Sequence, residues 1–441
     1  MFRFGLNPAG FALGKRNVHY SWVIVAVASV MWMTSSGMRF AAAILVDEFE
    51  KEPFGWSIGA IAAGFTIQWV VSGTLAPVCG WMADRWGVRK VMWAGGVLFI
   101  IGMVLTAFMQ NLWQFYLYFG VILAAGMAAF QVTLVSGVTL WFRKQLGLAM
   151  GILQGLQGIG TAFAILLVFI LFDQFGLRMT FLIPGLVGGA ILMLLVKFFY
   201  NEPAEIGLRP LGVTGDEPIK RSQKDETAKI RSSVFLQQAQ RTSTFWNLIG
   251  IHYWGCMGHN IINVLVVAIA VDRGLSLGVA AGVLAVQQGT GVFARGVVPV
   301  IAERLGCKTV WIAGMSLQAF PLLIILFAND AWAFYVFAIL FGIGQSCEVP
   351  TFQIANRQYY GNVPQGSLYG WQNVGNGLGM GMAPVLAGVL WDITNTYAAP
   401  LIMSLGFSLM GLVFALMLPS PRSRLIPDWE RHLPVSARSP G

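Results

Sequence analysis

Two arginines lie inside apolar stretches of the chain. Arg295 is the single charged residue of QQGTGVFARGVVPV (residues 287–300), and Arg39 lies eight residues before Asp47, toward the end of another apolar run. A charge in hydrocarbon costs several kcal/mol, so each arginine needs a partner, a path to water or a function. A guanidinium is a planar fork of donors that matches a carboxylate, which makes anion binding one chemistry open to them.

The spacing around Arg295 is compatible with a helix face that lines a cavity, but it does not establish one. Gln288, Gly291 and Arg295 fall at i, i+3 and i+7 of a helix and share one face, although Val292 lies on that face too. Two structural roles stay open. The arginine lies six residues, about 9 Å, before Ile301, so its side chain could reach the membrane surface, or it could belong to an ion pair. A functional and an interfacial role are likewise both open for Arg39.

An acid and a histidine in other apolar runs could move protons. Glu348 lies deep in FGIGQSCEVPTFQ (residues 341–353), where it could carry a proton or act as a counter-ion for Arg295. His259, in HYWGCMGHNIIN (residues 252–263), could relay protons, although a histidine in such a place is more often a hydrogen-bonded packing residue.

Other chemistries have little support in the sequence. The four cysteines show neither CxxC nor Cys/His spacing, which argues against a disulfide framework and a metal site. The glycine-rich GILQGLQGIG (residues 151–160) follows no predicted strand, so it indicates close helix packing rather than nucleotide binding. We therefore expect no catalytic residue, no metal and no cofactor, and we do not expect an enzyme.

The elements that must position these residues are membrane spans. Of the 441 residues 56% are hydrophobic and 11% are charged, against about 25% charged in soluble proteins, and the mean hydropathy is +0.69. A span needs about 20 mainly apolar residues. Twelve stretches qualify: 20–45, 56–82, 90–109, 113–141, 146–172, 178–200, 245–271, 276–301, 308–328, 331–356, 364–391 and 398–419.

The distribution of charge orients these spans. A polar segment, 201–243, divides them six and six. With the N-terminus inside, all but five of the 28 lysines and arginines fall on the inner side or in its loops, as the positive-inside rule requires. The basic excess is thus topological, and nucleic-acid binding is not expected. We expect two six-helix bundles (1–200 and 244–420), an inner linker (201–243) and an inner tail (421–441).

The two halves repeat each other at an offset of 219 residues. ADRWGVRKV (83–91) lies over AERLGCKTV (302–310), which pairs Asp84 with Glu303 and Arg85 with Arg304. The same offset places Gly151, Gly158 and Gly160 over Gly370, Gly377 and Gly379. A duplicated unit in parallel orientation is typical of transporters that bind solute between their halves near the midplane.

With these features on hand, the chain resembles the major facilitator superfamily. GWMADRWGVRK (80–90) is similar to the family signature between the second and third helices, except that Val88 separates Gly87 from Arg89. The resemblance implies an all-α membrane fold of twelve helices in two pseudo-symmetric bundles. It also implies that the signature loop and its repeat latch one conformation. The residues that it assigns to this latch are Gly80, Asp84, Arg85, Gly87, Arg89, Glu303 and Arg304.

Three further stretches resemble the monocarboxylate and oxalate–formate branch of that superfamily: PAEIGLRPLG (203–212), VDRGLSLGVAAGVLAV (271–286) and MGMAPVLAGVLWDITNTY (380–397). The branch carries an arginine near Arg295, which makes Arg295 the expected anchor of an anion. The acid or amide that the branch has one turn earlier is Gly291 here, so Glu348 could take over proton coupling. Arg39 matches a lysine of the monocarboxylate carriers by region and charge.

The sequence therefore predicts a secondary transporter, at the cell inner membrane, of a small organic anion coupled to a proton or a counter-anion. The eleventh span, with YGWQNVGNG (369–377), lacks the lysine of the oxalate carrier pattern, which favours a monocarboxylate. Efflux of amphipathic drugs is the rival within transport, and a solute sensor without transport is a weaker one. The expected substrate-binding residues are Arg295, Arg39, Gln288, Tyr116, Asn260, Tyr369, Trp371 and Asn373, and the proton-coupling candidates are Glu348 and His259.

Overall fold

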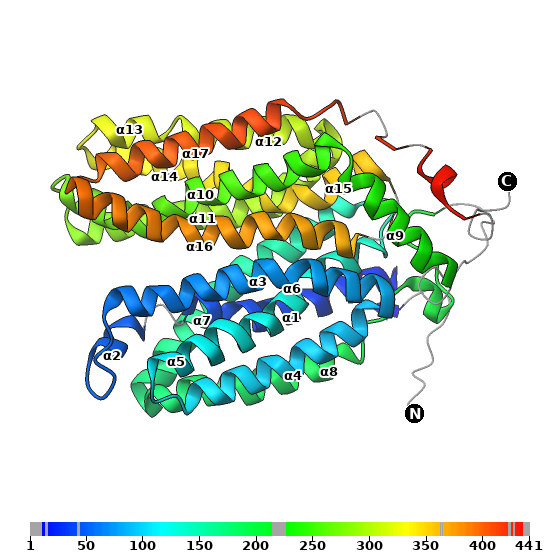
Figure 1. Ribbon diagram of the computed structural model, residues 1–441, viewed down its shortest axis with the longest axis horizontal. Coiled ribbons are helices and arrows are strands. Elements are labelled where there is room, and N and C mark those ends of the chain that lie inside the picture. The colour runs from blue at the N-terminus through cyan, green and yellow to red at the C-terminus, as the bar shows by residue number, and fades with distance from the viewer. Residues whose placement is uncertain are drawn as a thin grey trace.

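Two bundles of long helices lie side by side (Figure 1). The first half of the chain forms one bundle and the second half the other, and α1 begins at the same end of the molecule at which α17 finishes. We call this the basic end; it also carries the α3–α4 connection and the linker helix α9. The computed structural model describes residues 11–13, 16–41, 45–213, 226–361, 363, 365–421, 425–426 and 428–434.

The first bundle follows a short pair of antiparallel strands, β1 (Phe11–Leu13) and β2 (Arg16–Val18). Its helices are α1 (Tyr20–Ala41), α2 (Val46–Glu50), α3 (Ile58–Trp86), α4 (Val88–Ala107), α5 (Leu112–Phe115), the π-helix η2 (Tyr116–Leu123), α6 (Ala124–Thr139), α7 (Leu146–Ile183), the π-helix η3 (Pro184–Gly188) and α8 (Gly189–Val196).

The linker and the second bundle complete the chain. The linker contains the 3₁₀-helix η4 (Pro203–Ile206) and α9 (Glu226–Gln240). The bundle consists of α10 (Ser243–Asp272), α11 (Leu277–Leu305), α12 (Cys307–Ala319), α13 (Leu322–Phe327), α14 (Ala331–Ser346), the 3₁₀-helix η5 (Val349–Thr351), α15 (Phe352–Tyr360), α16 (Gly366–Thr394) and α17 (Ala398–Leu416), and the 3₁₀-helix η6 (Trp429–His432) follows.

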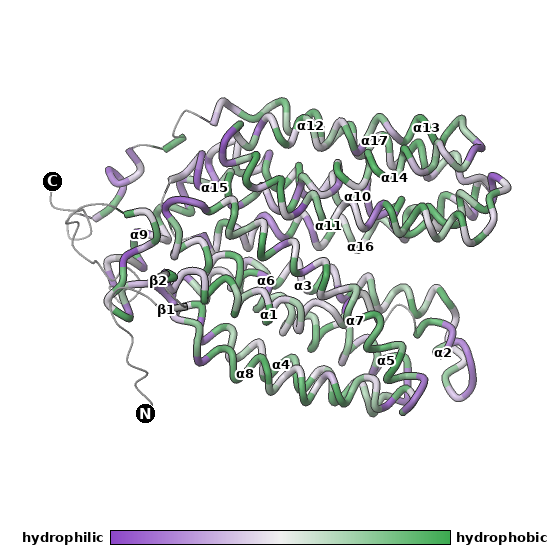
Figure 2. Tube along the Cα trace, turned by 180° about the vertical axis from the view of Figure 1, so that it is seen from behind, coloured by the Kyte–Doolittle hydropathy of each residue, from purple (hydrophilic) through white to green (hydrophobic). Residues whose placement is uncertain are grey.

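The predicted all-α membrane fold is confirmed. Among the described residues, eleven helical stretches are long and apolar enough to cross a membrane. The longest, Leu146–Val196, reverses direction at Gly176, whose φ of 73° is readily adopted only by glycine. It therefore accounts for two crossings and brings the total to the expected twelve. Hydrophobic residues cover the helices, whereas hydrophilic ones gather at both ends, around α2 and around α9 (Figure 2).

The tenth span is broken, which the sequence analysis did not anticipate. The helix stops at Ser346 and resumes at Phe352, after a 3₁₀ turn that contains Pro350. Proline lacks an N–H and disfavours the helical conformation of the residue before it, so it ends the hydrogen-bond ladder here. The carbonyl of Glu348 accepts instead from the indole Nε1 of Trp311, at 3.2 Å. The break thus leaves Glu348 at a helix end rather than in mid-helix.

The two bundles meet along two seams that are related by the internal repeat. Seam one joins α3 to α16 and seam two joins α7 to α11. Glycines let the backbones approach. A Cβ added to Gly158 would lie 2.6 Å from a methyl carbon of Val292, and one added to Gly73 would lie 2.6 Å from the Cα of Gly377. These two pairs are equivalent under the 219-residue offset. Small residues at helix contacts are what membrane packing requires, because no hydrophobic gain drives association in lipid.

We expect even one added methyl group at a seam to destabilise the protein. Gly73→Ala would press its Cβ against backbone, which cannot turn aside, and overpacking of this kind costs about 1–3 kcal/mol. The melting temperature of the purified protein, followed by tryptophan fluorescence, should fall. Gly59→Ala is the matched control on the same helix, because nothing lies within 4 Å of its added Cβ. Equal melting temperatures for the two variants would contradict close packing at this seam.

Candidate functional site

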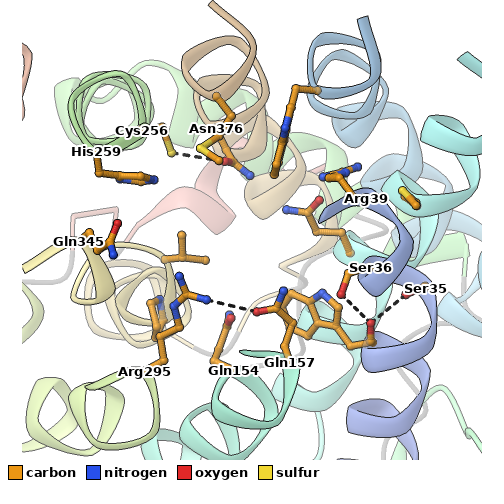
Figure 3. Close-up of a pocket in the computed structure, with 17 residues that line it drawn as sticks. Ser35, Ser36, Arg39, Gln154, Gln157, Cys256, His259, Arg295, Gln345 and Asn376 are labelled. Atoms are coloured by element: carbon orange, nitrogen blue, oxygen red, sulfur yellow. Dashed lines mark hydrogen bonds between the residues drawn. The ribbon is translucent and has the colours of Figure 1, made fainter. Parts of the chain in front are cut away.

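A cavity of about 120 Å³ lies between the bundles, and both bundles contribute to its wall. From the first bundle come α1, α3, α6 and α7, and from the second come α10, α11, α14, η5 and α16. Figure 3 shows Arg39 and Arg295 on opposite sides of it. Two tryptophans, Trp32 and Trp69, give the wall an aromatic part. The polar residues of the wall are Ser35, Ser36, Arg39, Gln131, Gln154, Gln157, His259, Arg295, Gln345 and Asn376.

Arg39 is held in place by its own bundle. The residue is 6% exposed, its Nη2 donates to the Oγ of Ser72 at 3.0 Å, and its guanidinium carbon lies 4.1 Å from the ring centroid of Trp69. A cation over an aromatic face is attracted by the ring quadrupole, and more strongly once water is removed. These contacts orient the guanidinium without neutralising its charge.

Arg295 reaches across the seam from the second bundle. Its Nη1 donates to the Oε1 of Gln157 on α7, at 3.5 Å, which is long for a hydrogen bond. A neutral amide leaves the charge of the arginine uncompensated. No aspartate or glutamate is among the described residues that line the cavity. The cavity therefore presents two cationic groups, one from each bundle, to any solute that enters it.

Glu348 lies behind the cavity wall. It is fully buried, with its Oε2 3.4 Å from the Nδ1 of His259 and its Oε1 3.5 Å from the Sγ of Cys256. His259 and Cys256 both line the cavity, so they stand between this carboxyl group and the solute space. Within the described chain Glu348 makes no ion pair with Arg295. The counter-ion arrangement weighed for these two residues is thus not the one in this structure.

The same region contains donors that could ligate a metal. One ligand atom each of His252, Cys256 and Glu348 lie within 4.8 Å of one another. His252 approaches the carbonyl of Gln372 through its Nδ1, at 2.9 Å, and its ring stacks on Phe352. No sequence spacing indicated this group, because Glu348 comes from a different helix than the other two.

Three of the expected substrate-binding residues lie outside the cavity, where they serve local contacts. Gln288 is exposed and donates to Asn263 at 3.2 Å. It shares a face with Arg295, but seven residues place it about 10 Å farther along the helix, beyond the cavity. Tyr116 donates to the carbonyl of Ala60 at 2.9 Å, and Asn260 donates to the carbonyl of Met380 at 2.8 Å. In this structure both of these polar groups therefore satisfy backbone carbonyls.

The three candidates on α16 do not line the cavity either. Tyr369 is fully buried in the core, and Trp371 packs edge-on against Phe245. Asn373 lies immediately behind the wall, where its Oδ1 accepts from the Nε2 of Gln131 at 2.9 Å. Asn373 thus orients a cavity residue across the seam and does not face the solute space itself. Asn376, one turn farther along α16, lines the cavity instead.

The repeat offset contained a signal for the glutamines that sequence reasoning missed. Adding 219 to Gln154 and Gln157 gives Asn373 and Asn376. All four are amides on pseudo-equivalent helices, and three of them line the cavity. The amides of GILQGLQGIG thus repeat at the same offset as its glycines Gly151, Gly158 and Gly160. Amides that recur at the repeat period inside spans would have indicated a polar cavity.

Carboxylates close both seams at the basic end. The Oδ1 and Oδ2 of Asp84 accept from the backbone N–H groups of Gly366 and Ser367, at 3.1 and 2.7 Å, at the start of α16. At the equivalent place of the other seam, the Oε2 of Glu303 accepts from the N–H of Gly147 at 2.9 Å. A carboxylate at a helix N-terminus satisfies orphan donors and the positive end of the helix dipole. Sequence reasoning expected this contact for Asp84.

The other residues assigned to the latch divide into two groups. Gly80 lies at the seam, because a Cβ there would overlap the carbonyl of Gly366. Arg85 stacks on Trp81 within the first bundle, and the peptide N–H of Arg89 donates to Asn201 at the start of the linker, at 2.9 Å. Gly87 turns the chain with a φ of 91° next to Asn201, and Arg304 is exposed. These four residues shape the loops and make no described contact across a seam.

The sequence as a whole matches a known family. The model of the Major Facilitator Superfamily matches residues 21–306 and 255–439. The chain belongs to this superfamily. Its members are transporters, which agrees with a polar cavity enclosed between two bundles. The fold is similar to that of the superfamily's proton:xylose symporter XylE, with a TM-score of 0.68, 14% identity, and coverage of 93% of this chain and 98% of that one.

Two curated relatives within the superfamily are transporters of carboxylates by name. The oxalate:formate antiporter of Oxalobacter formigenes is 24% identical over 60% of this chain, and the match spans 58% of that protein's length. Monocarboxylate transporter 11 of Homo sapiens is 25% identical over 91% of this chain and 83% of its own length. The predicted resemblance to this branch is confirmed at low identity.

We expect the carboxylate contacts to stabilise the superfamily fold in this conformation. Asp84→Asn keeps an acceptor oxygen but removes the charge from the start of α16, which is worth about 0.3–1 kcal/mol and up to about 2 in a partly buried place. The melting temperature should fall, and Asp84→Asn with Glu303→Gln should lower it further. Asp392→Asn, an exposed acid on α16, is the control. A double variant as stable as the control would refute the latch.

Proposed function

We propose that this protein is a secondary transporter of a small organic anion, a monocarboxylate in the first place, which it moves by alternating access. The observation that carries the proposal is the pair of arginines, Arg39 and Arg295, that reach one cavity from opposite bundles. Because the described wall contains no carboxylate, two like charges face each other there without compensation. An anion between them would relieve this repulsion and hold the two bundles together.

The dimensions of the cavity favour a small solute. At about 120 Å³ it is well below the roughly 300–1,000 Å³ of sites for drug-sized ligands. Amide and hydroxyl groups share the wall with the apolar side chains of Trp32, Trp69, Met127, Val349, Pro350 and Met380, which suits a small anion that carries an apolar part. These features weigh against the efflux of amphipathic drugs, for which a large apolar cavity would be needed.

The number of charges available favours one carboxylate over two. Arg39 already donates to Ser72 and stacks on Trp69, whereas the one hydrogen bond of Arg295 within the described residues is a long one to a neutral amide. Arg295 is therefore the primary anchor of the carboxylate in this proposal. Arg39 contributes a second positive charge that attracts the anion into the cavity. The eleventh span contributes Asn376 and Met380 to the described wall and no further cation, which disfavours a dianion.

Alternating access would proceed by exchange of the seam contacts. In this structure the carboxylates of Asp84 and Glu303 hold both seams at the basic end. We take this end as cytoplasmic by the positive-inside rule, with both termini inside and the protein in the inner membrane. To open toward that side, the protein would have to break both carboxylate contacts and also separate the glycine-packed helices of the two seams.

Glu348 is the proposed proton carrier, with His259 as the group between it and the cavity. Glu348 is buried, and acids inside membrane spans commonly belong to proton relays. The neighbouring His259 borders the solute space, so a proton could pass from cavity water through the imidazole to Glu348. Symport with a proton is the coupling that this arrangement supports, and anion exchange is the alternative.

The first experiment is a thermal-shift screen of purified wild type and Arg295→Gln against small mono- and dicarboxylates, sugars, amino acids and cationic drugs. Binding raises the melting temperature by mass action. We expect a shift with one monocarboxylate class, and an apparent affinity at least about 30-fold weaker in Arg295→Gln, since removal of a buried charge partner costs about 2–5 kcal/mol.

Two further variants sharpen this screen. Arg39→Gln should lower the apparent affinity for the same ligand by a smaller factor. Arg273→Gln, an arginine at the opposite end that contacts Asn329 and Leu326, should bind as wild type does. A shift for drugs or neutral solutes that survives Arg295→Gln would overturn the proposal and make efflux the leading function. A stronger shift for dicarboxylates would correct the substrate class.

Coupling is tested with the carboxylate that this screen identifies. In proteoliposomes, Glu348→Gln should lose accumulation driven by an imposed pH gradient, because the amide cannot carry a proton. It should retain exchange of labelled against unlabelled substrate, which needs no net proton movement. Accumulation at the wild-type level in Glu348→Gln would refute the role of Glu348. Loss of both activities, with loss of ligand binding, would assign Glu348 to structure.

A further inference from the structure

A second hollow lies on the surface of the first bundle, at the basic end. It is a groove of about 740 Å³ between the start of α4 and the end of α8, and its described lining shares no residue with the cavity between the bundles. Three cationic residues form its rim: Arg89, Lys90 and Lys197. Trp93, Met193 and Leu194 form the apolar wall below them.

The rim has an excess of positive charge. No acidic residue is among the described residues that line the groove. Arg89 is oriented by a hydrogen bond of its Nη2 to the backbone carbonyl of Lys197, at 3.3 Å, and its guanidinium carbon lies 5.9 Å from the ring centroid of Tyr200. Neither contact neutralises it. Lys90 and Lys197 are both exposed. An anionic group placed between them would be attracted by all three cations.

The wall below the rim faces the lipid. Trp93 is 56% exposed and Leu194 is 54% exposed. Both lie one turn or less from the rim residues on their own helices, toward the middle of the membrane. Tryptophan is enriched at the level of the headgroups, where one part of a ligand is polar and the next is apolar. The groove thus combines a cationic rim with an apolar surface that continues into the hydrocarbon.

We propose that this groove is a binding site for an anionic phospholipid of the leaflet that meets the basic end. The phosphate lies among Arg89, Lys90 and Lys197, and an acyl chain runs along Trp93 and Leu194. Basic pockets between membrane helices on the inner side are suited to such headgroups. A free phosphate ion would use the rim alone, and the apolar wall would then have no function.

Binding at this place would join α4 to α8. The two helices are the third and sixth spans of the first bundle. Their basic ends are already connected by the bond from Arg89 to the carbonyl of Lys197 and by Asn201, which accepts from the N–H of Arg89. A lipid phosphate would add an ionic contact next to the turn at Gly87, which carries the chain from α3 into α4.

The test uses the full-length protein delipidated in a neutral detergent. Dioleoylphosphatidylglycerol, dioleoylphosphatidylcholine and inorganic phosphate are each titrated while the melting temperature is followed, and lipid retention is measured by native mass spectrometry. We expect the anionic lipid to stabilise wild type and to be retained, and the other two probes to have little effect. Equal stabilisation by the two lipids would overturn the proposal, and so would equal stabilisation by inorganic phosphate.

Variants assign the effect to this groove. Lys90→Gln with Lys197→Gln should lower the affinity for the anionic lipid about 30-fold, since each basic residue near an anionic surface changes the affinity about fivefold. The matched control removes two exposed or half-exposed lysines of the same end outside the groove, by Lys144→Gln with Lys229→Gln. Equal weakening in both double variants would show a general surface effect and refute the site. Should the first double variant fail to fold, Lys90→Gln and Lys197→Gln alone should each weaken binding about fivefold.

Discussion

Two guanidinium groups held in a low-dielectric interior constrain the rest of this structure. A charge in hydrocarbon is tolerated only where protein or water surrounds it, so Arg39 and Arg295 have to lie between bundles rather than on a lipid-facing surface. The seams must then pack closely enough to exclude lipid and still leave a polar space between them. Glycines on the four seam helices provide the close approach, while amides and hydroxyls line the space.

The cavity and the seams are mechanically linked through the same helices. Arg295 and Glu303 lie on α11, eight residues apart, so the helix that presents a cation to the cavity also closes seam two at the basic end. On α16, Ser367 and Asn376 are similarly separated, and they contact the latch and the cavity respectively. Binding of an anion in the cavity therefore acts on α11 and α16, and these same helices carry the contacts that close the seams at the basic end.

Composition and pattern were enough to predict the architecture, because burial in a membrane imposes long apolar runs that short connections separate. The repeat offset and the signature loop predicted the carboxylate at a helix N-terminus, since that chemistry depends on residues close in sequence. The lining of the cavity was harder. Whether Gln288 or Gln157 faces the solute depends on helix length and tilt, which single residues do not encode. The break at Pro350, which places Glu348 beside His259, likewise required three-dimensional context.

The symmetry of the closing contacts bears on the origin of the molecule. Each six-helix unit supplies one acid, Asp84 or Glu303, and one helix N-terminus, at Gly147 or Gly366, and each acid contacts the other unit's N-terminus. Two identical copies of one such unit, related by a two-fold axis, would form both contacts from a single pair of residues, as any isologous interface does. A half-length ancestor could thus have closed as a homodimer before its gene was duplicated and fused. Fusion then freed the two halves to diverge, and an arginine on the first span of one half and on the second span of the other is a product of that freedom.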